Sequence, residues 1–176
     1  IILSIVRSEV VDIQAVATPV LSKKYEDICS VRLTFKNGCV ANITASRISD
    51  KSVRKMRIFC ADRYLNLDFA AKQAWIYSKT PKLDEANFNV ENVDISKIDD
   101  LMQFVFNDLI RVEQVVIGEE EPLKAELKHF LRSVQTGERP QVGGEEGLAA
   151  IQLAHEILKK ARDHYAKHVP EEHRRW

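Results

Sequence analysis

The sequence predicts an α+β fold in which an open, predominantly antiparallel β-sheet carries helices packed on one face. Two observations predict it. Residues 9–79 hold runs rich in β-branched and aromatic residues, separated by turn signals such as Asn37-Gly38. Residues 119–165 instead place apolar side chains at helical spacing. Strands followed by helices are typical of a sheet covered on one side, and 176 residues suit a single domain over 1–176.

Composition and charge exclude several classes of partner. Lys+Arg and Asp+Glu both number 26, so the chain lacks the basic excess that nucleic acid requires. No apolar run approaches the ~18 residues of a membrane span, which predicts no membrane partner. The three cysteines are an odd number without C-x-x-C spacing. We therefore expect buried free thiols in a reducing cytoplasm, and no disulfide or metal site.

The first twenty residues predict the end of a helix and then a strand. Ile1, Ile2, Ile5 and Val6 follow helical spacing, and no methionine or basic leader precedes them. We therefore expect this chain to be a piece of a longer protein. Residues 9–20 are rich in β-branched side chains and form the first predicted strand.

The hairpin over residues 31–46 decides which side chains share a face. A two-residue turn at Asn37-Gly38 would place Phe35 opposite Val40, whereas a three-residue loop with Gly38 at a bulge separates apolar from polar residues. The cleaner separation favours the bulged turn. It predicts an apolar face of Val31, Leu33, Phe35, Cys39, Ala41, Ile43 and Ala45, and a polar face of Arg32, Thr34, Asn42, Thr44 and Ser46.

The rest of the chain continues the sheet and then adds the helices. Further strands are predicted over 53–61, 64–70, 72–79 and 109–117. Residues 80–100 are acidic and rich in Asn, which indicates a surface excursion, and 101–109 suit either helix or strand. Two amphipathic helices follow, the first ended by Gly137. Their stripes are Leu123, Leu127, Phe130, Leu131 and Val134, and then Leu148, Ile151, Ala154, Leu158, Ala161 and Tyr165.

No catalytic, cofactor-binding or metal-binding residue is predicted. The segment VGGEEG at 142–147 follows a loop and lacks the G-x-G-x-x-G spacing of a dinucleotide site, so we interpret it as the lead-in to a helix. His164 and His168 have a metal-chelating i, i+4 spacing, but solvated side chains near a helix end explain them more simply.

The end of the hairpin is the candidate substrate-binding site. Arg47 lies in phase with an apolar strand face, and a charge there must reach the sheet rim or meet an anion. Ser46 and Arg54 lie close in sequence, so Ser46, Arg47 and Arg54 together suit recognition of hydroxyls or a phosphate. The alternative is an arginine in a structural ion pair. The polar face of the hairpin likewise has two explanations, a wet surface or a contact with another subunit.

Four stretches in this order resemble the C-terminal domain of the Gfo/Idh/MocA oxidoreductases, the glucose-fructose oxidoreductase and inositol dehydrogenase family. They are the truncated first helix, LTFKNGCVANITASR at 33–47, MRIFCADRYLNLDF at 56–69 and EPLKAELKHFLRSVQTGERPQVGGEEGLAAIQLAHEIL at 121–158. The resemblance runs from residue 1 to about 162, and the excursion at 80–100 departs from the family's shorter connection.

The resemblance implies a full-length parent that oxidises a sugar, nucleotide-sugar or cyclitol with NAD or NADP bound by an N-terminal Rossmann domain. That domain and its proton-transfer residues are absent here, so this chain alone would bind no cofactor and be inactive. In the family the sheet forms a wall of the substrate pocket and packs against a second subunit. We therefore expect a cytoplasmic homodimer or homotetramer that associates through the open sheet face, with Arg47 nearest the sugar. Residues 44–49 and 56–69 are similar to members that act on UDP-N-acetylglucosamine. The alternative is a stand-alone dimerisation or ligand-binding module without redox activity.

Overall fold

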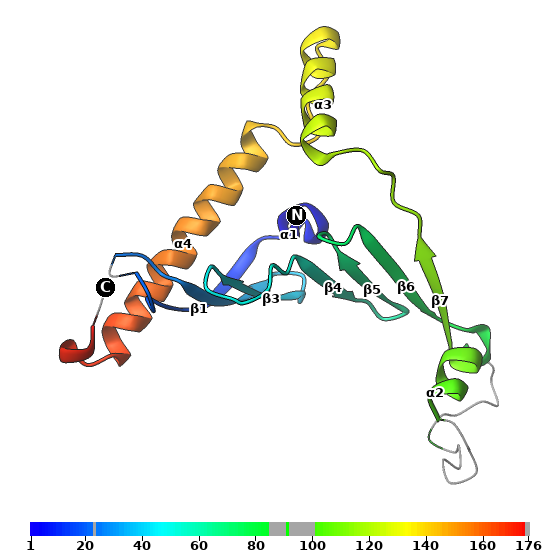
Figure 1. Cartoon of the computed structure of the whole chain (residues 1–176), viewed down its shortest axis with the longest axis horizontal. Helices are drawn as coiled ribbons and strands as arrows, with labels where there is room; N and C mark the ends of the chain where they lie inside the picture. Colours follow the sequence, from blue (N-terminus) through cyan, green and yellow to red (C-terminus); the bar gives the residue numbers. More distant parts are fainter. Residues whose placement is uncertain (23, 85–90, 92–100, 175–176) are drawn as a thin grey trace. The chain divides into compact units, whose positions relative to one another are not determined.

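The computed structural model describes residues 1–22, 24–84, 91 and 101–174. Contacts divide the chain into two compact units, 1–50 with 122–176 and 51–121, and each is described by itself (Figure 1). All pairings between described strands are antiparallel. The predicted open α+β class is confirmed, but the strands pair into two sheets, of three and four strands. A single domain over 1–176 stays a prediction.

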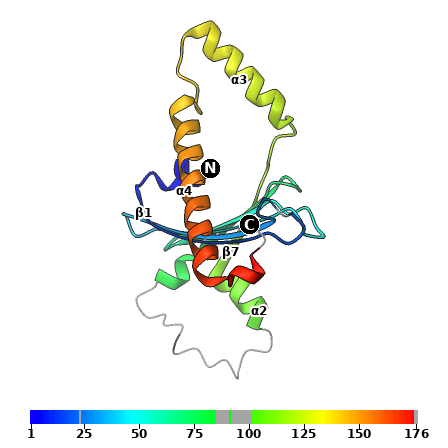
Figure 2. The same ribbon diagram turned by 90° about the vertical axis from the view of Figure 1, so that its left-hand side faces the viewer.

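The first unit is a three-stranded sheet with a long helix on one face. Its elements are α1 (Ile2–Val6), β1 (Val10–Thr18), β2 (Ile28–Phe35), β3 (Val40–Ser46), α3 (Pro122–Thr136) and α4 (Gly144–His168), in the sheet order β1-β2-β3. Figure 2 shows α4 running across this sheet. Ala161 of α4 joins Leu33 and Phe35 in the buried core, and these three side chains are at most 1% exposed. This side of the sheet is therefore the core side.

The bulged turn predicted for the hairpin is confirmed. Leu33 pairs with Ala41, and the Phe35 N–H donates to the Cys39 carbonyl oxygen at 2.9 Å, which leaves a three-residue loop. Gly38 has φ +85°, a left-handed conformation that glycine adopts without strain. The apolar side chains Val31, Leu33 and Phe35 are buried, while their neighbours along β2 face away from the core.

The second unit is a four-stranded antiparallel sheet. Its elements are β4 (Lys55–Phe59), β5 (Arg63–Asp68), β6 (Gln73–Lys79), a 3-10 turn (Pro81–Asp84), α2 (Leu101–Phe104), a π-helical turn (Val105–Leu109) and β7 (Ile110–Val115), in the sheet order β4-β5-β6-β7. The ambiguous segment 101–109 is helical. Residues 85–90 and 92–100 of the predicted surface excursion lie outside the described residues.

The helical stripes differ in how far they are covered. In α4, Ala161 and Tyr165 are buried, whereas Leu148 and Ile151 are exposed. In α3, all five predicted stripe residues are more than half exposed, so the described part of its unit leaves this amphipathic face uncovered. No helix in the described part of the chain has the length and apolar character needed to cross a membrane.

The cysteines are free, but the expectation that they are buried is wrong for two of them. Cys39 lies in the hairpin turn and Cys60 follows the end of β4, and both are exposed. Turn positions carry the chain over the surface, so strand-like sequence beside them does not bury the thiol. Cys29 is half-buried on the core side of β2; burial raises the pKa of its thiol, and the charge of Glu26 adds to that rise.

Candidate functional site

Arg47 lies directly after β3 and is bonded to the chain that precedes β2. Its Nε lies 3.2 Å from Asp27 Oδ1 and donates to the Glu26 carbonyl oxygen at 3.1 Å. Its Nη2 donates to the same carbonyl oxygen. The Arg47 backbone N–H donates to the Asp27 carbonyl oxygen at 3.0 Å. Two neighbouring residues therefore fix both the main chain and the guanidinium of Arg47.

Asp27 is a buried carboxylate that organises the connection between β1 and β2. Its Oδ2 accepts the backbone N–H groups of Val20, Leu21 and Ser22 at 2.8, 2.7 and 2.8 Å. The bonds from Ser22 and Val20 hold the pKa of Asp27 below its ordinary value; burial opposes them, and Leu21 and Arg47 add to the lowering. The carboxylate is thus kept ionised by donors that only the folded connection supplies.

The three predicted substrate-binding residues do not lie in one unit. Ser46 and Arg47 are adjacent after β3, and the Ser46 Oγ accepts the Ile48 N–H at 3.3 Å. Arg54 belongs to the other unit, where its carbonyl oxygen accepts the Phe69 N–H at 2.8 Å. The structural alternative for Arg47, an ion pair, is present. Its side chain remains 55% exposed, so ligand binding through the outer edge of the guanidinium stays a prediction.

The face of the β1–β3 sheet opposite α4, called the outer face here, mixes polar and apolar side chains. Arg32 and Asn42 pair across β2 and β3, and the Arg32 Nη1 donates to Asn42 Oδ1 at 3.2 Å. Val16, Ile28 and Val40 are exposed on the same face. This face carries the polar residues that the bulged turn predicted, and the described residues of its unit leave it uncovered.

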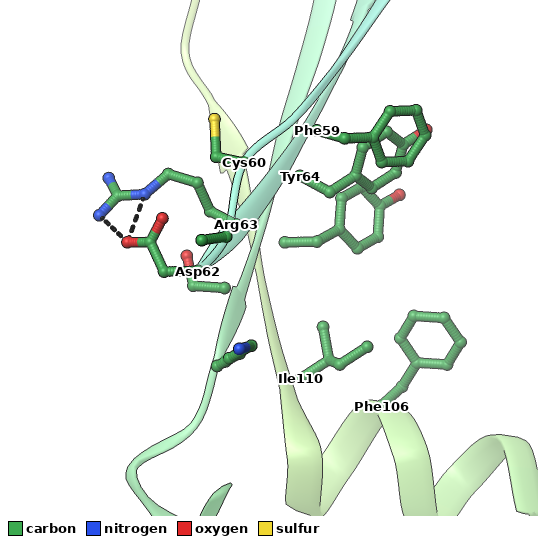
Figure 3. Close-up of a pocket in the computed structure, with 11 residues that line it drawn as sticks. Phe59, Cys60, Asp62, Arg63, Tyr64, Phe106 and Ile110 are labelled. Atoms are coloured by element: carbon green, nitrogen blue, oxygen red, sulfur yellow. Dashed lines mark hydrogen bonds and ion pairs between the residues drawn. The ribbon is translucent and has the colours of Figure 1, made fainter. Parts of the chain in front are cut away.

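A second candidate site, absent from our predictions, lies in the unit formed by residues 51–121. It is an open cavity of about 430 Å³ at one end of the β4–β7 sheet (Figure 3). Four aromatic rings line it. Phe59 stacks on Tyr64 with centroids 4.7 Å apart and planes 10° from parallel, and Tyr64 stacks on Tyr77 at 5.0 Å. Phe106 meets Tyr77 edge-on at 6.4 Å.

The charged residues of this cavity lie apart from the rings. Figure 3 shows Phe59, Tyr64 and Phe106 on one side of the strands and the Asp62 and Arg63 side chains on the other. Asp62 Oδ2 accepts from Arg63 Nη2 at 2.7 Å and from Nε at 3.0 Å. That bond lowers the pKa of Asp62 and raises the pKa of Arg63. The aromatic side of the cavity therefore offers a contact surface, and the acid and base beside it are bound to each other.

The sequence contains the aromatic residues of this row, but only the pairing between strands shows that they lie side by side. Phe59 lies opposite Tyr64, and Tyr64 lies opposite Tyr77. Once the turn at residues 60–62 fixes the register of β4 against β5, alternation along each strand brings these rings to one face. Alternation within one strand does not give its register against the next strand, so the sequence of each strand alone does not predict the row.

The start of α4 is occupied by the chain's own glutamate. The Gly143 N–H donates to Glu146 Oε2 at 2.8 Å, a bond that lowers the pKa of Glu146. Arg139 Nη2 lies 2.6 Å from Glu145 and 2.8 Å from Glu146. Two carboxylates at this helix start do not fit the phosphates of a dinucleotide, which agrees with the interpretation of residues 142–147 as a helix lead-in.

The two histidines of α4 lie close together, with ring centroids 4.6 Å apart for His164 and His168. Within the described residues, no group of three or more His, Cys, Asp or Glu side chains is arranged to hold a metal ion. A two-histidine chelate without a third protein ligand falls short of the three or four ligands typical of protein zinc sites.

Comparison with known proteins connects both units to sugar oxidoreductases. No model of a protein family matches the chain. Over 72 residues, 41% of this chain and 23% of the relative, it is 39% identical to UDP-N-acetylglucosamine 3-dehydrogenase of Acidithiobacillus ferrooxidans. A crystal structure of that dehydrogenase superposes with a TM-score of 0.70 at 25% identity, covering 90% of this chain and 42% of the other.

A second solved structure shows the same fold at lower identity. Aldose-aldose oxidoreductase from Caulobacter crescentus superposes with a TM-score of 0.64 at 17% identity, covering 92% of this chain and 42% of that chain. The present chain thus spans less than half the length of these proteins.

Proposed function

We propose, from the premise that this chain is a C-terminal domain of the Gfo/Idh/MocA-type oxidoreductases, that it is the substrate-binding and oligomerisation part of an enzyme acting on a sugar or nucleotide-sugar. The observation that carries the proposal is the agreement of local sequence and of fold with one protein, the UDP-N-acetylglucosamine 3-dehydrogenase. UDP-N-acetylglucosamine is therefore the first substrate to test.

The nicotinamide cofactor, NAD or NADP, is proposed to be held by a part of the parent protein outside this chain. The residues present here do not fit it, because the glycine-containing helix start at 143–147 is filled by Glu146 and flanked by Glu145. A pyrophosphate placed there would meet two carboxylates. This chain supplies no step of hydride transfer, and we expect it to be inactive alone.

Arg47 is proposed to contact the substrate, with Ser46 beside it. Arg54 is proposed as a further substrate-binding residue on the strength of the sequence alone. The Asp27 and Glu26 contacts use Nε and Nη2, and they hold the guanidinium in one orientation. A guanidinium held in this way loses little side-chain entropy when an anion binds its exposed edge. A phosphate of a nucleotide-sugar has the charge and geometry for that edge.

Oligomerisation is proposed to use the open outer face of the β1–β3 sheet, giving a homodimer or homotetramer. Val16, Ile28 and Val40 provide exposed apolar area, and Arg32 and Asn42 provide polar groups between them. A mixture of apolar and hydrogen-bonding groups is typical of contacts between subunits. The alternative is a sheet face that stays exposed to solvent and makes no contact with another subunit.

The enzymatic proposal is tested in the complete protein that contains this chain. Incubated with UDP-N-acetylglucosamine and either NAD⁺ or NADP⁺, it should form reduced nicotinamide, while the present chain alone should form none. UDP-glucose is the matched control substrate: it has a hydroxyl where UDP-N-acetylglucosamine has the acetamido group, so comparing the two rates shows whether that group is recognised. Absence of turnover with every nucleotide-sugar and free sugar, under conditions where the complete protein is folded, would reject an oxidoreductase role.

Arg47→Ala tests the substrate contact in the same complete protein. Loss of an anchoring guanidinium should raise KM for a nucleotide-sugar about tenfold or more. Arg132→Ala is the matched control, because Arg132 is also an exposed arginine of this unit and has an ion pair of its own, with Glu138. Equal KM values for both variants and the wild type would remove Arg47 from the site.

The rival function is a stand-alone dimerisation or ligand-binding module without redox activity. The gene decides between the two. An upstream reading frame of about 120 residues that carries a glycine fingerprint after its first strand supports the dehydrogenase. A coding sequence that begins at Ile1 supports the rival.

A further inference from the structure

The tip of the β2–β3 hairpin carries an Asn-Gly pair, Asn37 and Gly38. Both residues are exposed. In the described part of the chain, no atom beyond its chain neighbours lies within 4 Å of the position that a Cβ atom would take on Gly38. Among dipeptides, Asn-Gly loses its side-chain amide most readily, because glycine has no side chain to shield its own backbone nitrogen. The hairpin tip is therefore both accessible and chemically reactive.

The reaction of such a pair needs no reagent other than water. The backbone nitrogen of Gly38 attacks the Asn37 side-chain carbon Cγ, and the new C–N bond closes a five-membered succinimide ring. The side-chain nitrogen leaves as ammonia and takes the proton of the Gly38 N–H. Water then adds to either ring carbonyl and breaks one C–N bond. The product is an aspartate, or an isoaspartate whose main chain runs through the side-chain carbons.

In the folded tip both reacting groups are engaged elsewhere. The Gly38 N–H donates to the Phe35 carbonyl oxygen at 2.9 Å, which directs the nitrogen away from the Asn37 side chain. Asn37 Oδ1 accepts the Cys39 N–H at 3.1 Å, which holds the side-chain amide in place. Both bonds have to open before the Gly38 nitrogen can reach Cγ of Asn37. The fold therefore slows a reaction that the sequence favours.

The end of α1 and the residues after it hold the same tip. The Asn37 N–H donates to Ser8 Oγ at 3.2 Å, and Asn37 Nδ2 donates to the Val6 carbonyl oxygen at 3.5 Å, a long and weak bond. The Lys36 N–H donates to the Glu9 carbonyl oxygen at 2.9 Å. The first two contacts join residues 29 and 31 positions apart, so they form only when the first unit is folded.

We propose that Asn37 is a modification site, at which the chain converts its own asparagine to aspartate or isoaspartate, and that the contacts with Val6 and Ser8 set the rate. Conversion is slow while residues 6–9 hold the tip and faster whenever this contact opens locally. The reaction needs only the hairpin and the segment that holds it, so it does not depend on the proposed oxidoreductase role.

The products alter the hairpin at the end far from Arg47. Isoaspartate adds one carbon atom to the main chain of the loop that sets the register of β2 against β3. Either product replaces the Nδ2 donor to Val6 by a carboxylate oxygen, which cannot donate. Arg47 follows the other end of β3, where Ile28 pairs with Ser46. We therefore expect modification to destabilise the first unit and to leave the surroundings of Arg47 unchanged.

Storage of the folded chain in mildly alkaline buffer, followed by peptide mapping, tests the proposal. Trypsin releases residues 37–47 as one peptide, because Lys36 and Arg47 bound it. Mass spectrometry should find Asn37 converted, while Asn42 of the same peptide stays intact, since it lies within β3 and precedes Ile43. A synthetic peptide of residues 33–47 gives the rate without the fold. It should react about tenfold faster, because two hydrogen bonds no longer have to open.

Ser8→Ala tests whether the contact with residues 6–9 sets the rate. The variant loses the acceptor for the Asn37 N–H and should speed conversion about fivefold. Ser4→Ala is the matched control: the Ser4 hydroxyl donates to the Ile1 carbonyl oxygen, three residues away. That variant also loses a serine hydrogen bond near the start of the chain and should leave the rate unchanged. Circular dichroism melting verifies that both variants are folded.

The outcomes decide as follows. Conversion that is slower in the chain than in the peptide, and that Ser8→Ala speeds and Ser4→Ala does not, supports the modification site and its control by residues 6–9. Equal rates in the folded chain and the peptide overturn the proposal, because the fold then holds nothing back. A chain in which Asn37 stays intact with and without Ser8, or a rate that Ser8→Ala does not change, overturns it as well.

Discussion

The β1–β3 sheet and the β4–β7 sheet are built from similar strands, yet they bury their side chains differently. The first sheet has one apolar face, where Leu33 and Phe35 are fully covered, and one mixed outer face. The second sheet has aromatic rings on one face and the aliphatic side chains Met56, Ile58, Leu65, Leu67 and Ile76 on the other. Of the described residues in its unit, only Ala74 and Leu109 are buried hydrophobics.

This difference shows how much each unit depends on other surfaces. An antiparallel sheet with one apolar face needs one covering layer, and α4 supplies it to the first sheet. A sheet that is apolar on both faces needs a layer on each. The second sheet therefore has more to gain from contacts beyond its own unit, and we expect truncation of a buried side chain to cost more stability in the first unit than in the second.

Leu33→Ala should produce the largest loss of stability. Leu33 is fully buried, so its truncation should cost about 3 kcal/mol from lost burial and the cavity left behind. Leu65→Ala is the matched control, because Leu65 is only half-buried and should cost about 1 kcal/mol. Urea unfolding followed by circular dichroism measures both. Equal losses would show that the two sheets are covered alike and would break the comparison.

Asp27→Asn should lower the free energy of unfolding, because it removes the negative charge that accepts three backbone N–H groups of the β1–β2 connection and pairs with Arg47. The folded state lowers the pKa of Asp27, so its contribution is fully present above the pKa that this carboxyl group has in the unfolded chain. That contribution disappears as pH falls through the folded-state pKa. The melting temperatures of wild type and variant should therefore differ at neutral pH and converge in acid.

The matched control for Asp27 is Asp62→Asn. The Asp62 pKa is also lowered, but its ion pair with Arg63 is exposed, with side chains 60% and 54% exposed. Exposed pairs contribute little to stability, because water screens them. A neutral-pH loss as large for Asp62→Asn as for Asp27→Asn would contradict the structural role assigned to the buried carboxylate.

Local sequence signals predicted the elements that depend on neighbouring residues. The hairpin register followed from the alternation around Gly38, and α3 begins at Pro122 and ends just before Gly137, as the sequence rules for helix ends require. The sequence predicts that Arg47 can form a structural ion pair, but it does not identify Asp27 as the partner. Its partner lies twenty residues earlier, and local periodicity carries no information about such contacts.

Two further features escaped prediction for the same physical reason. The division into two sheets depends on whether β3 pairs with β4. The polar residues of 47–54 indicate where β3 ends, but they do not indicate whether the next strand pairs with it. The aromatic row depends on registers across three strands, so a single shift of one residue would scatter Phe59, Tyr64 and Tyr77 over both faces. The candidate substrate residues Ser46, Arg47 and Arg54 rest on sequence proximity, and the structure assigns Arg54 to the other unit.

Gly38→Ala should have an intermediate effect on the first unit. The φ of +85° at Gly38 is unfavourable for a residue with a Cβ atom, and the substitution should cost about 1–2 kcal/mol. No other atom lies within 4 Å of the added methyl group, so the cost is conformational. Gly118→Ala is the control, since its added methyl group also meets open space and its φ is not positive. A neutral Gly38→Ala would contradict the bulged turn.

Phe59→Ala should have the smallest effect on the stability of a single chain. The ring stacks on Tyr64 but is mostly exposed, so its removal should cost about 0.5–1.5 kcal/mol at concentrations where the chain is monomeric. The cost should grow with protein concentration if the exposed ring contacts a second molecule, because such a contact adds to stability only when the partner is bound. Melting temperatures of wild type and Phe59→Ala over a hundredfold concentration range measure this growth. A constant difference would mean that the ring stabilises only its own sheet, and the expectation that the second sheet gains more than the first from contacts beyond its unit would then lose its main support.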